Sequence, residues 1–245
     1  MISVIMPYYR KKQFLESAVL SVLSQSYRDF ELIIIYDDNE KIDFEYVAKF
    51  KKIDSRIKII TNENNLGAGL SRNIGIKSSS GEYIAFLDSD DIWLKTKLEK
   101  QIKFMKEKNL DFSFTAYNLI DHLGNLVGER KAAEKLSYDD LIKSCDIGLS
   151  TVILKKKIID ENCQFVNLVT KEDYVLWLNV AKKNIEICGF NEKLTHWRKL
   201  NNSLSSNTFQ KFFDGYKVYN KYMGYNKIYS FINLLRLSIN YLLKR

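Results

Sequence analysis

The sequence predicts an α/β protein in which helices cover both faces of a mostly parallel, Rossmann-like central sheet, with a helical extension at the C-terminus. The first observation is a series of apolar runs without polar alternation, which is typical of strands buried on both faces. The second is that segments with helical periodicity separate these runs. The third is that carboxylates directly follow two of the runs, where such sheets bind ligands.

Four strands and four helices alternate in the first half of the chain. The apolar runs predict strands over 2–6, 30–36, 57–60 and 83–87. Apolar side chains that recur on one helical face predict helices over 14–23, around 47–53, over 68–77 and over 93–106. The second half is less regular. Strands are expected over 112–119, 149–154 and 185–188, a helix over 172–181, and two terminal helices over 209–222 and 225–243.

Composition restricts the kind of protein. The chain has 245 residues, 46% of them apolar, so it can bury the core of one large domain. Three widely spaced cysteines, Cys145, Cys163 and Cys188, predict free thiols in a reducing cytoplasm. No apolar stretch approaches the ~20 residues that span a bilayer. Residues 1–7 are interpreted as a strand and not as a signal peptide, because no basic segment or cleavage site accompanies them.

The stretch Asp88-Ser89-Asp90-Asp91 is the most informative in the chain. Three carboxylates occupy four positions directly after the strand expected over 83–87. So many like charges are unfavourable unless a cation neutralises them. A hard divalent cation takes oxygen ligands and accepts phosphate as a co-ligand. The pattern therefore predicts a metal-held diphosphate; the alternative is an acidic turn in which Asp91 caps the next helix.

Two further groups lie at predicted strand ends. Asp37 and Asp38 follow the strand over 30–36, so we expect them to share a crevice with Asp88, although turn chemistry is the alternative for such a residue. Asn65 and two glycines precede the helix over 68–77. Glycines let the backbone approach a ligand closely, and a helix N-terminus favours an anion.

Three segments together resemble the inverting nucleotide-sugar glycosyltransferases of family 2, which have the GT-A fold. They are residues 3–9 with 30–39, residues 64–75 with 81–91, and the run Lys171-Glu172-Asp173 that continues to Trp177. The resemblance implies a catalytic domain over 1–206, divided into a nucleotide-binding half (1–106) and an acceptor-binding half (107–206). Basic amphipathic helices would follow over 207–245.

The resemblance implies a donor site at the ends of the first strands. Pro7 ends the first strand, and the family position matched by Tyr9 contacts the nucleobase. The alternative for Tyr9 is a packing aromatic side chain. Asp38 matches the carboxylate that accepts from a uracil imide, and Arg72 matches an arginine that reaches toward the nucleotide, for which a surface ion pair is the alternative. The other implied nucleotide-sugar contacts are Asn65, Asp88 and Ser89.

The resemblance also implies a metal and a general base. Asp90 would bind Mn²⁺ or Mg²⁺ directly, and Asp88 would lie near both the ribose and the metal. Asp173 matches the base that takes the proton of the acceptor hydroxyl while the anomeric centre inverts in a single displacement. Glu172 would orient the acceptor. The alternative is that both acids only favour a helix N-terminus.

One departure from the family concerns histidine. Many relatives carry an aromatic-Arg-x-His pattern after the acidic pair, but here Leu200 stands where that histidine would be, and His196 lies upstream. We therefore assign no histidine to metal or phosphate. Arg198, Lys199 and Ser203 are the candidates for closing over the diphosphate.

These expectations define a metal-dependent inverting glycosyltransferase. It would transfer a sugar from a nucleoside-diphosphate donor, with UDP favoured, to a glycan or lipid-linked acceptor in bacterial cell-surface polysaccharide synthesis. A sugar nucleotidyltransferase is the alternative with the same fold, but residues 7–9 lack its Gly-rich signature. A non-catalytic membrane-associated scaffold is a second alternative, which intact Asp90 and Asp173 disfavour.

The tail raises a separate question. The net charge is +8, and from residue 207 onward seven basic side chains accompany one acidic side chain, Asp214. Because this basic excess lies in an apolar-rich tail and the predicted crevice is acidic, nucleic acid is disfavoured as a partner. Residues 225–245 could form a basic helix lying on an anionic membrane, at the inner face of the plasma membrane. Packing on the catalytic domain or on a second subunit of a homodimer is the alternative.

Overall fold

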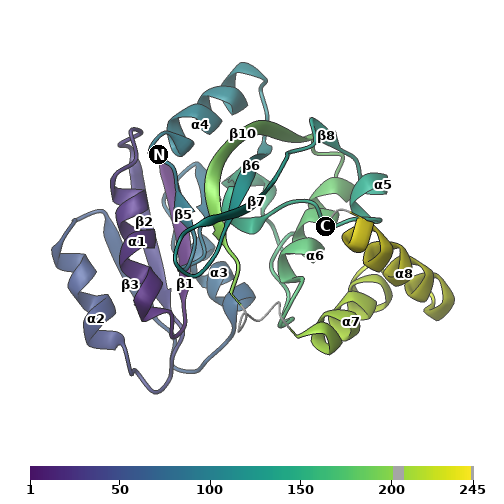
Figure 1. Ribbon diagram of the computed structural model, residues 1–245, viewed down its shortest axis with the longest axis horizontal. Coiled ribbons are helices and arrows are strands. Elements are labelled where there is room, and N and C mark those ends of the chain that lie inside the picture. Colours follow the sequence, from purple (N-terminus) through teal and green to yellow (C-terminus); the bar gives the residue numbers. More distant parts are fainter. Residues whose placement is uncertain (201–206, 244–245) are drawn as a thin grey trace.

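A computed structural model describes residues 1–200 and 207–243 of the chain. Within them, ten strands form one sheet (Figure 1). The main order along the sheet is β3 (Ile57–Thr61), β2 (Phe30–Tyr36), β1 (Ile2–Tyr8), β4 (Tyr83–Phe86), β9 (Ile153–Lys155), β6 (Phe112–Ile120), β10 (Ile187–Arg198) and β5 (Ile92–Trp93). Two further strands lie off this path: β7 (Leu126–Arg130) pairs with β6, and β8 (Lys135–Leu136) pairs with β10.

The first four strands of the chain form one parallel part of the sheet, and β6 and β10 form a second parallel pair. β1 pairs in parallel with both β2 and β4, and β2 pairs with β3. Tyr8 lies opposite Tyr36 at the end of the β1–β2 register, so both strands end at the same edge. The segments beginning at Asp37 and Leu87 leave the sheet there, which confirms that the acidic groups after β2 and β4 emerge at one edge.

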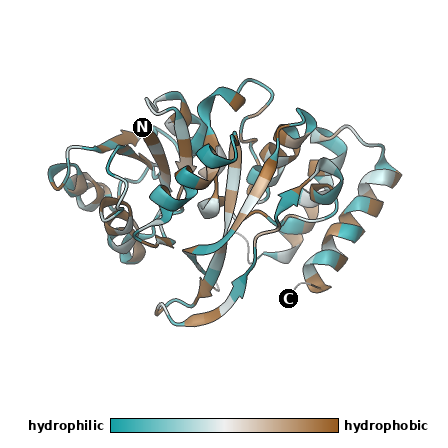
Figure 2. Cartoon of the chain, turned by 90° about the horizontal axis from the view of Figure 1, so that it is seen from above, coloured by the Kyte–Doolittle hydropathy of each residue, from teal (hydrophilic) through white to brown (hydrophobic). Residues whose placement is uncertain are grey.

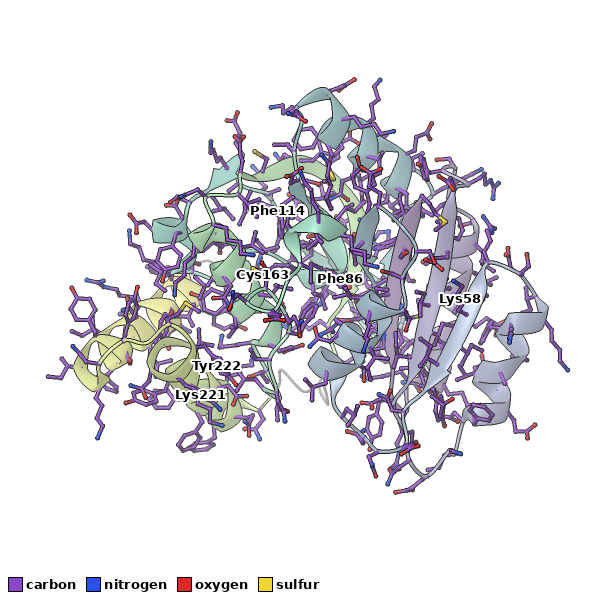
Figure 3. All side chains as sticks on the ribbon, turned by 180° about the vertical axis from the view of Figure 1, so that it is seen from behind. Lys58, Phe86, Phe114, Cys163, Lys221 and Tyr222 are labelled. Carbon is purple, nitrogen blue, oxygen red and sulfur yellow. The ribbon has the colours of Figure 1, made fainter. Side chains whose placement is uncertain are left out.

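Helices cover both faces of this parallel part, as the sequence predicts. Alternate residues of a strand point to opposite faces. Val4 and Leu32 pack with α1 (Lys12–Leu23), α2 (Phe44–Ala48) and α4 (Lys97–Glu107). Ile5 and Ile33 pack with α3 (Ala68–Lys77) and α6 (Glu172–Lys182). Phe86 and Cys163 belong to this second cluster and lie near the centre of the molecule in Figure 3.

Three predicted elements were wrong in part. Trp93 belongs to β5, antiparallel to β10, and the helix begins only at Lys97. The strand expected over 149–154 begins as a 3₁₀ turn (Leu149–Thr151), and only β9 follows, antiparallel to both β4 and β6.

The strand expected to end at Cys188 continues to Arg198. Polar residues and register shifts after Phe190 interrupt its apolar pattern, which explains the early end. β7, β8 and the short helix α5 (Tyr138–Leu141) were not predicted.

The C-terminal segment packs on the second half of the chain. It consists of α7 (Thr208–Lys217), a π-helical turn (Val218–Tyr222) and α8 (Lys227–Leu243). Val218, Tyr219 and Leu234 belong to the same buried cluster as α6. α7 and α8 lie side by side at the end of the molecule opposite α2 (Figure 1). Among residues 1–200 and 207–243, no helix is both long and apolar enough to cross a bilayer.

Candidate active site

Asp37 holds the loop that leads into α3. Its buried carboxylate accepts hydrogen bonds from the backbone amides of Leu66 and Gly67, both at 2.8 Å, and from the Asn62 side chain at 2.8 Å. The Asn65 side chain donates to the Asp37 carbonyl oxygen at 2.8 Å. Asn65 is thus fixed beside the carboxyl end of β2, next to the N-terminus of α3, where the sequence analysis places a ligand.

Asp38 is fully buried and is paired with Arg10. Arg10 Nε lies 2.9 Å from Asp38 Oδ2, and the second bond, from Nη2 to Oδ1, is 3.2 Å long. The Arg10 guanidinium, together with the Glu40 amide, holds the pKa of Asp38 below its ordinary range, against the opposing effect of burial. Tyr9 is 45% exposed and contacts Arg10, so it is not a core aromatic residue. Pro7 lies in β1 opposite Ile35, and the strand continues to Tyr8, so the expectation that Pro7 ends it was wrong by one residue.

Arg72 joins the two predicted carboxylate groups. It lies on α3, is 3% exposed, and donates to Asp88 Oδ1 and to Glu172 Oε1, both at 2.7 Å. This geometry excludes the surface ion pair considered as the alternative. Gly69, one turn earlier on α3, permits the close approach, because an added Cβ would lie 2.9 Å from Glu172 Cγ and 3.0 Å from the Val166 carbonyl oxygen.

Hydrogen bonds to Ser150 and Arg198 hold the acidic stretch after β4. Asp91 is 1% exposed and accepts from Ser150 Oγ at 2.6 Å and from the Arg198 amide at 2.8 Å. Ser150 Oγ also accepts from the Asp88 amide at 3.1 Å. Burial first, and then the charges of Asp90 and Asp88, raise the pKa of Asp91 well above its ordinary value. Ser150 was not predicted, and no charge or motif in the sequence distinguishes it.

Asp90 and Asp88 are the remaining acids of this stretch. Burial and the neighbouring charge of Asp88 raise the pKa of Asp90, while Lys11 Nζ, 3.1 Å from its Oδ2, opposes the shift. The described ranges contain no cluster of three or more His, Cys, Asp or Glu residues suited to a metal. Two carboxylates still fit a hard cation, because Mg²⁺ and Mn²⁺ in phosphate-binding sites take the rest of their ligands from phosphate and water.

Arg198 donates hydrogen bonds to the backbone of the acidic stretch and of the loop between β6 and β7. Its Nε donates to the Asp90 carbonyl oxygen at 2.9 Å, and Nη1 donates to the carbonyl oxygens of Asp121 and His122 at 2.9 and 3.2 Å. These bonds direct two of the three guanidinium nitrogens, Nε and Nη1, to backbone carbonyl oxygens. His196 lies in β10 opposite Ile92, and burial lowers its pKa.

The two other candidates for closing over the diphosphate give no evidence of that role. The Lys199 amide extends the pairing with β6 by donating to the Ile120 carbonyl oxygen at 2.8 Å. Ser203 lies outside the described residues.

Asp173 lies in the first turn of α6, beside Glu172. Its Oδ1 accepts from the Tyr174 amide at 2.7 Å. Burial, followed by the charge of Glu172, raises the pKa of Asp173 to about 7, while Arg72 opposes the shift. A carboxyl group with a pKa near neutral suits a general base, since it is ionised at working pH and still accepts a proton readily.

Comparison with known proteins identifies the family of the chain. The model of the family "Glycosyl transferase family 2" matches residues 3–154. The chain therefore belongs to glycosyl transferase family 2.

Three named relatives are also similar over most of the chain. The chain is 40% identical over 208 residues (84% of this chain, 82% of the relative) to TuaG of Bacillus subtilis, named as a teichuronic acid biosynthesis glycosyltransferase. It is 40% identical over 214 residues (86% and 82%) to WfgD of Escherichia coli, and 35% identical over 244 residues (100% and 95%) to WfaP of Escherichia coli. Both are named UDP-Glc:alpha-D-GlcNAc-diphosphoundecaprenol beta-1,3-glucosyltransferases. The chain is thus a glycosyltransferase.

Solved structures agree on the fold. TarS of S. aureus, residues 1–349 with UDP-GlcNAc, superposes with a TM-score of 0.73 at 20% identity, covering 95% of this chain and 70% of that one. The mannosyltransferase PcManGT of Pyrobaculum calidifontis, with GDP-Man and Mn²⁺, gives a TM-score of 0.71 at 10% identity, with coverage of 95% and 69%. The GT-A fold predicted from the sequence is confirmed.

Proposed function

We propose that this chain is a metal-dependent inverting glycosyltransferase that uses a nucleoside-diphosphate sugar, with UDP favoured, in the synthesis of a bacterial cell-surface polysaccharide. The observation that carries the proposal is the Arg72 bridge, because one buried guanidinium links the donor-side Asp88 to the acceptor-side Glu172. A site that transfers a group between two substrates needs the two binding regions at a fixed separation.

The donor side would use residues at the ends of β1, β2 and β4. We assign the nucleobase to Tyr9 and Asp38, with Pro7 near the end of β1, and the rest of the nucleotide to Asn65, Arg72, Asp88 and Ser89. Asp38 is now bonded to Arg10, so a uracil imide could reach it only if Arg10 moves aside. Asp90, with Asp88, would hold Mn²⁺ or Mg²⁺, which neutralises charge on a departing diphosphate when bound. The raised pKa of Asp90 supports this role, since a cation would relieve the repulsion from Asp88.

The acceptor side would use Asp173 as the general base. The acceptor hydroxyl gives its proton to Asp173 while its oxygen bonds to the anomeric carbon, and the bond from that carbon to the diphosphate breaks with its electron pair leaving on the diphosphate. Glu172, held by Arg72, would orient the acceptor. WfgD and WfaP are named for a diphosphoundecaprenol-linked acceptor, and we propose a lipid-linked acceptor for this chain as well.

The C-terminal helices support a location at a membrane surface. On α8 the side chains that face the protein are Ser230, Asn233, Leu234 and Leu237. The opposite face carries an exposed apolar stripe with helical spacing: Ile228, Ile232, Leu235, Ile239 and Leu242. Figure 2 shows brown segments recurring along this helix, next to the C-terminus mark. Phe209 and Phe213 on α7 are also exposed.

Charge favours an anionic lipid surface as the partner of this stripe. Five basic residues lie between 207 and 243, and the one acidic side chain there, Asp214, is fully buried. Basic side chains around an exposed apolar helix face are typical of helices at anionic membranes. We therefore propose a cytoplasmic protein bound peripherally at the inner face of the plasma membrane.

Vesicle sedimentation tests the membrane proposal. The full chain should sediment with phosphatidylglycerol vesicles, less so at high salt, and should not sediment with phosphatidylcholine alone. The double variant Leu235→Asn with Ile239→Asn should lose binding, whereas Leu20→Asn, at an exposed apolar residue of α1, should not. If the unaltered chain stays in solution and the double variant instead dissociates a dimer, the stripe is a subunit interface.

Donor turnover tests the proposed activity. The purified chain is incubated with UDP-, GDP- and dTDP-sugars and Mn²⁺, with and without chelator, and nucleoside diphosphate release is measured. Chelator-sensitive release from one donor supports the proposal. If no nucleotide binds in the presence of metal, the catalytic proposal fails and the membrane-associated scaffold replaces it.

A further inference from the structure

Asp214 on α7 is a fully buried carboxylate far from the sequence motifs. Its Oδ2 accepts from the Thr170 amide at 3.0 Å, from Thr170 Oγ1 at 3.1 Å and from the Gln210 side chain at 2.9 Å. Lys217 Nζ lies 3.5 Å from Oδ1. Burying a charge is costly unless it is well bonded. The Asp214 carboxylate therefore depends on its hydrogen bonds to Thr170 and Gln210.

What Asp214 holds is the turn directly before the acidic pair. Thr170 and Lys171 precede Glu172 and Asp173, and Lys171 has the left-handed φ of 65° that non-glycine residues rarely adopt. Such a conformation persists only where the surroundings determine it. Gly215, next to Asp214, lies against the Lys171 side chain, so α7 contacts both residues of the turn.

A second contact fixes the other side of the acidic pair. The hydroxyl groups of Tyr219 and Tyr174 are 3.1 Å apart, and Tyr219 also donates to the Ile142 carbonyl oxygen at 2.9 Å. The C-terminal segment therefore contacts Thr170, in the turn before the acids, and Tyr174, on α6 after them. The acids themselves accept no bond from this segment in the described residues.

We propose that Asp214 is a positioning residue for the transfer reaction. By holding the Thr170–Lys171 turn, it fixes where Glu172 and Asp173 lie relative to Arg72 and the donor. This inference rests on the proposed function, in which Asp173 is the base. It makes the C-terminal segment a part of the active site's support, in addition to its exposed face.

The test compares Asp214→Ala and Asp214→Asn in the full chain with the control Asp54→Asn. Asp54 also accepts from a backbone amide, that of Arg56 at 2.9 Å, but it lies before β3. We expect Asp214→Ala to speed amide hydrogen exchange over residues 170–174 and to lower kcat about 10- to 100-fold, because small misplacements of a reacting group cost that much. The KM for donor should change by less than about threefold, since the donor groups lie on other elements.

Asp214→Asn keeps one acceptor oxygen for the Thr170 amide, so its loss of kcat should be smaller, and it serves if the alanine variant does not fold. The control should match the unaltered chain in both measurements. Unchanged exchange over 170–174, or a kcat within twofold of the unaltered chain, would overturn the proposal. Inactivity of the unaltered chain on every donor would overturn the proposed function, and the exchange comparison would still decide whether Asp214 holds the turn.

Discussion

The two halves of the site are supported in different ways. In the proposed donor half, the carboxylates follow parallel strands, and loops brought to the sheet edge hold them, as Asp37 accepts from the amides of Leu66 and Gly67. In the proposed acceptor half, the acidic pair opens a helix, and α7, some forty residues further along the chain, holds the turn before that helix. The donor carboxylates therefore take their positions from the ends of strands, whereas the acceptor acids take theirs from a turn that packs against a C-terminal helix.

The largest expected effect falls on the acceptor half. Asp173→Asn keeps the shape of the side chain but removes the basic oxygen, so kcat for transfer should fall about 10²- to 10⁴-fold. Nucleotide affinity, measured by calorimetry with UDP and Mn²⁺, should stay within about threefold. Equal losses of nucleotide binding and of kcat would show that the two halves are not separable and that Asp173 is not a dedicated base.

The donor half should respond to metal. Asp90→Ala should lower turnover about 10²-fold and abolish most of its dependence on Mn²⁺, because a bound metal contributes several kcal/mol to stabilising transition-state charge. Chelation of the unaltered chain should give a similar loss that added Mn²⁺ reverses. Asp111→Ala, at a surface acid paired with two lysines, is the control. Full activity in chelator would assign the acidic stretch a structural role only.

The pH dependence should come from the acceptor half. Asp173 must be ionised to act, and its pKa is about 7, so kcat/KM should fall about tenfold for each pH unit below 7. The free energy of unfolding should change in the opposite direction. Because the pKa of Asp173 is raised in the folded protein, its protonated form favours folding, and this contribution to the free energy of unfolding is lost as pH rises through 7. Asp173→Asn should therefore raise the Tm at pH 8 relative to the unaltered chain, and this gain should vanish near pH 4. A gain that is equal at both pH values would contradict a raised pKa.

The smallest effect concerns the support shared by the donor carboxylates. Ser150→Ala removes a donor to Asp91 and an acceptor for the Asp88 amide, which should destabilise the chain by about 1–3 kcal/mol. Chemical denaturation measures this loss, and the apparent Mn²⁺ affinity should weaken in parallel. Ser17→Ala, whose hydroxyl bonds only within α1, is the control and should cost less. A stable variant with unchanged metal affinity would show that Ser150 does not position the acidic stretch.

The same comparison explains which elements were predictable. The bounds of β2 and α3 follow from uninterrupted apolar and helical patterns, and the acidic residues at the sheet edge follow from their place after strands. Ser150 and Asp214 carry no such signal, because a serine and an aspartate become important only when folding brings distant segments to them. The length of β10 was missed for a related reason. Its second half contains polar residues without a strand pattern, and these residues form a strand because they pair with β6. Arg10 and its pairing with Asp38 were likewise missed.

The two proposed halves are in close contact at Gly69. An alanine there would place its methyl group against the Glu172 side chain and the Val166 carbonyl oxygen, so these groups would have to move away from α3. In a displacement reaction the attacking oxygen must come within about 3–3.5 Å of the carbon along one line. In the proposed reaction, the close approach of α3 to Glu172 would form part of that distance, and the absence of a side chain at Gly69 permits this approach.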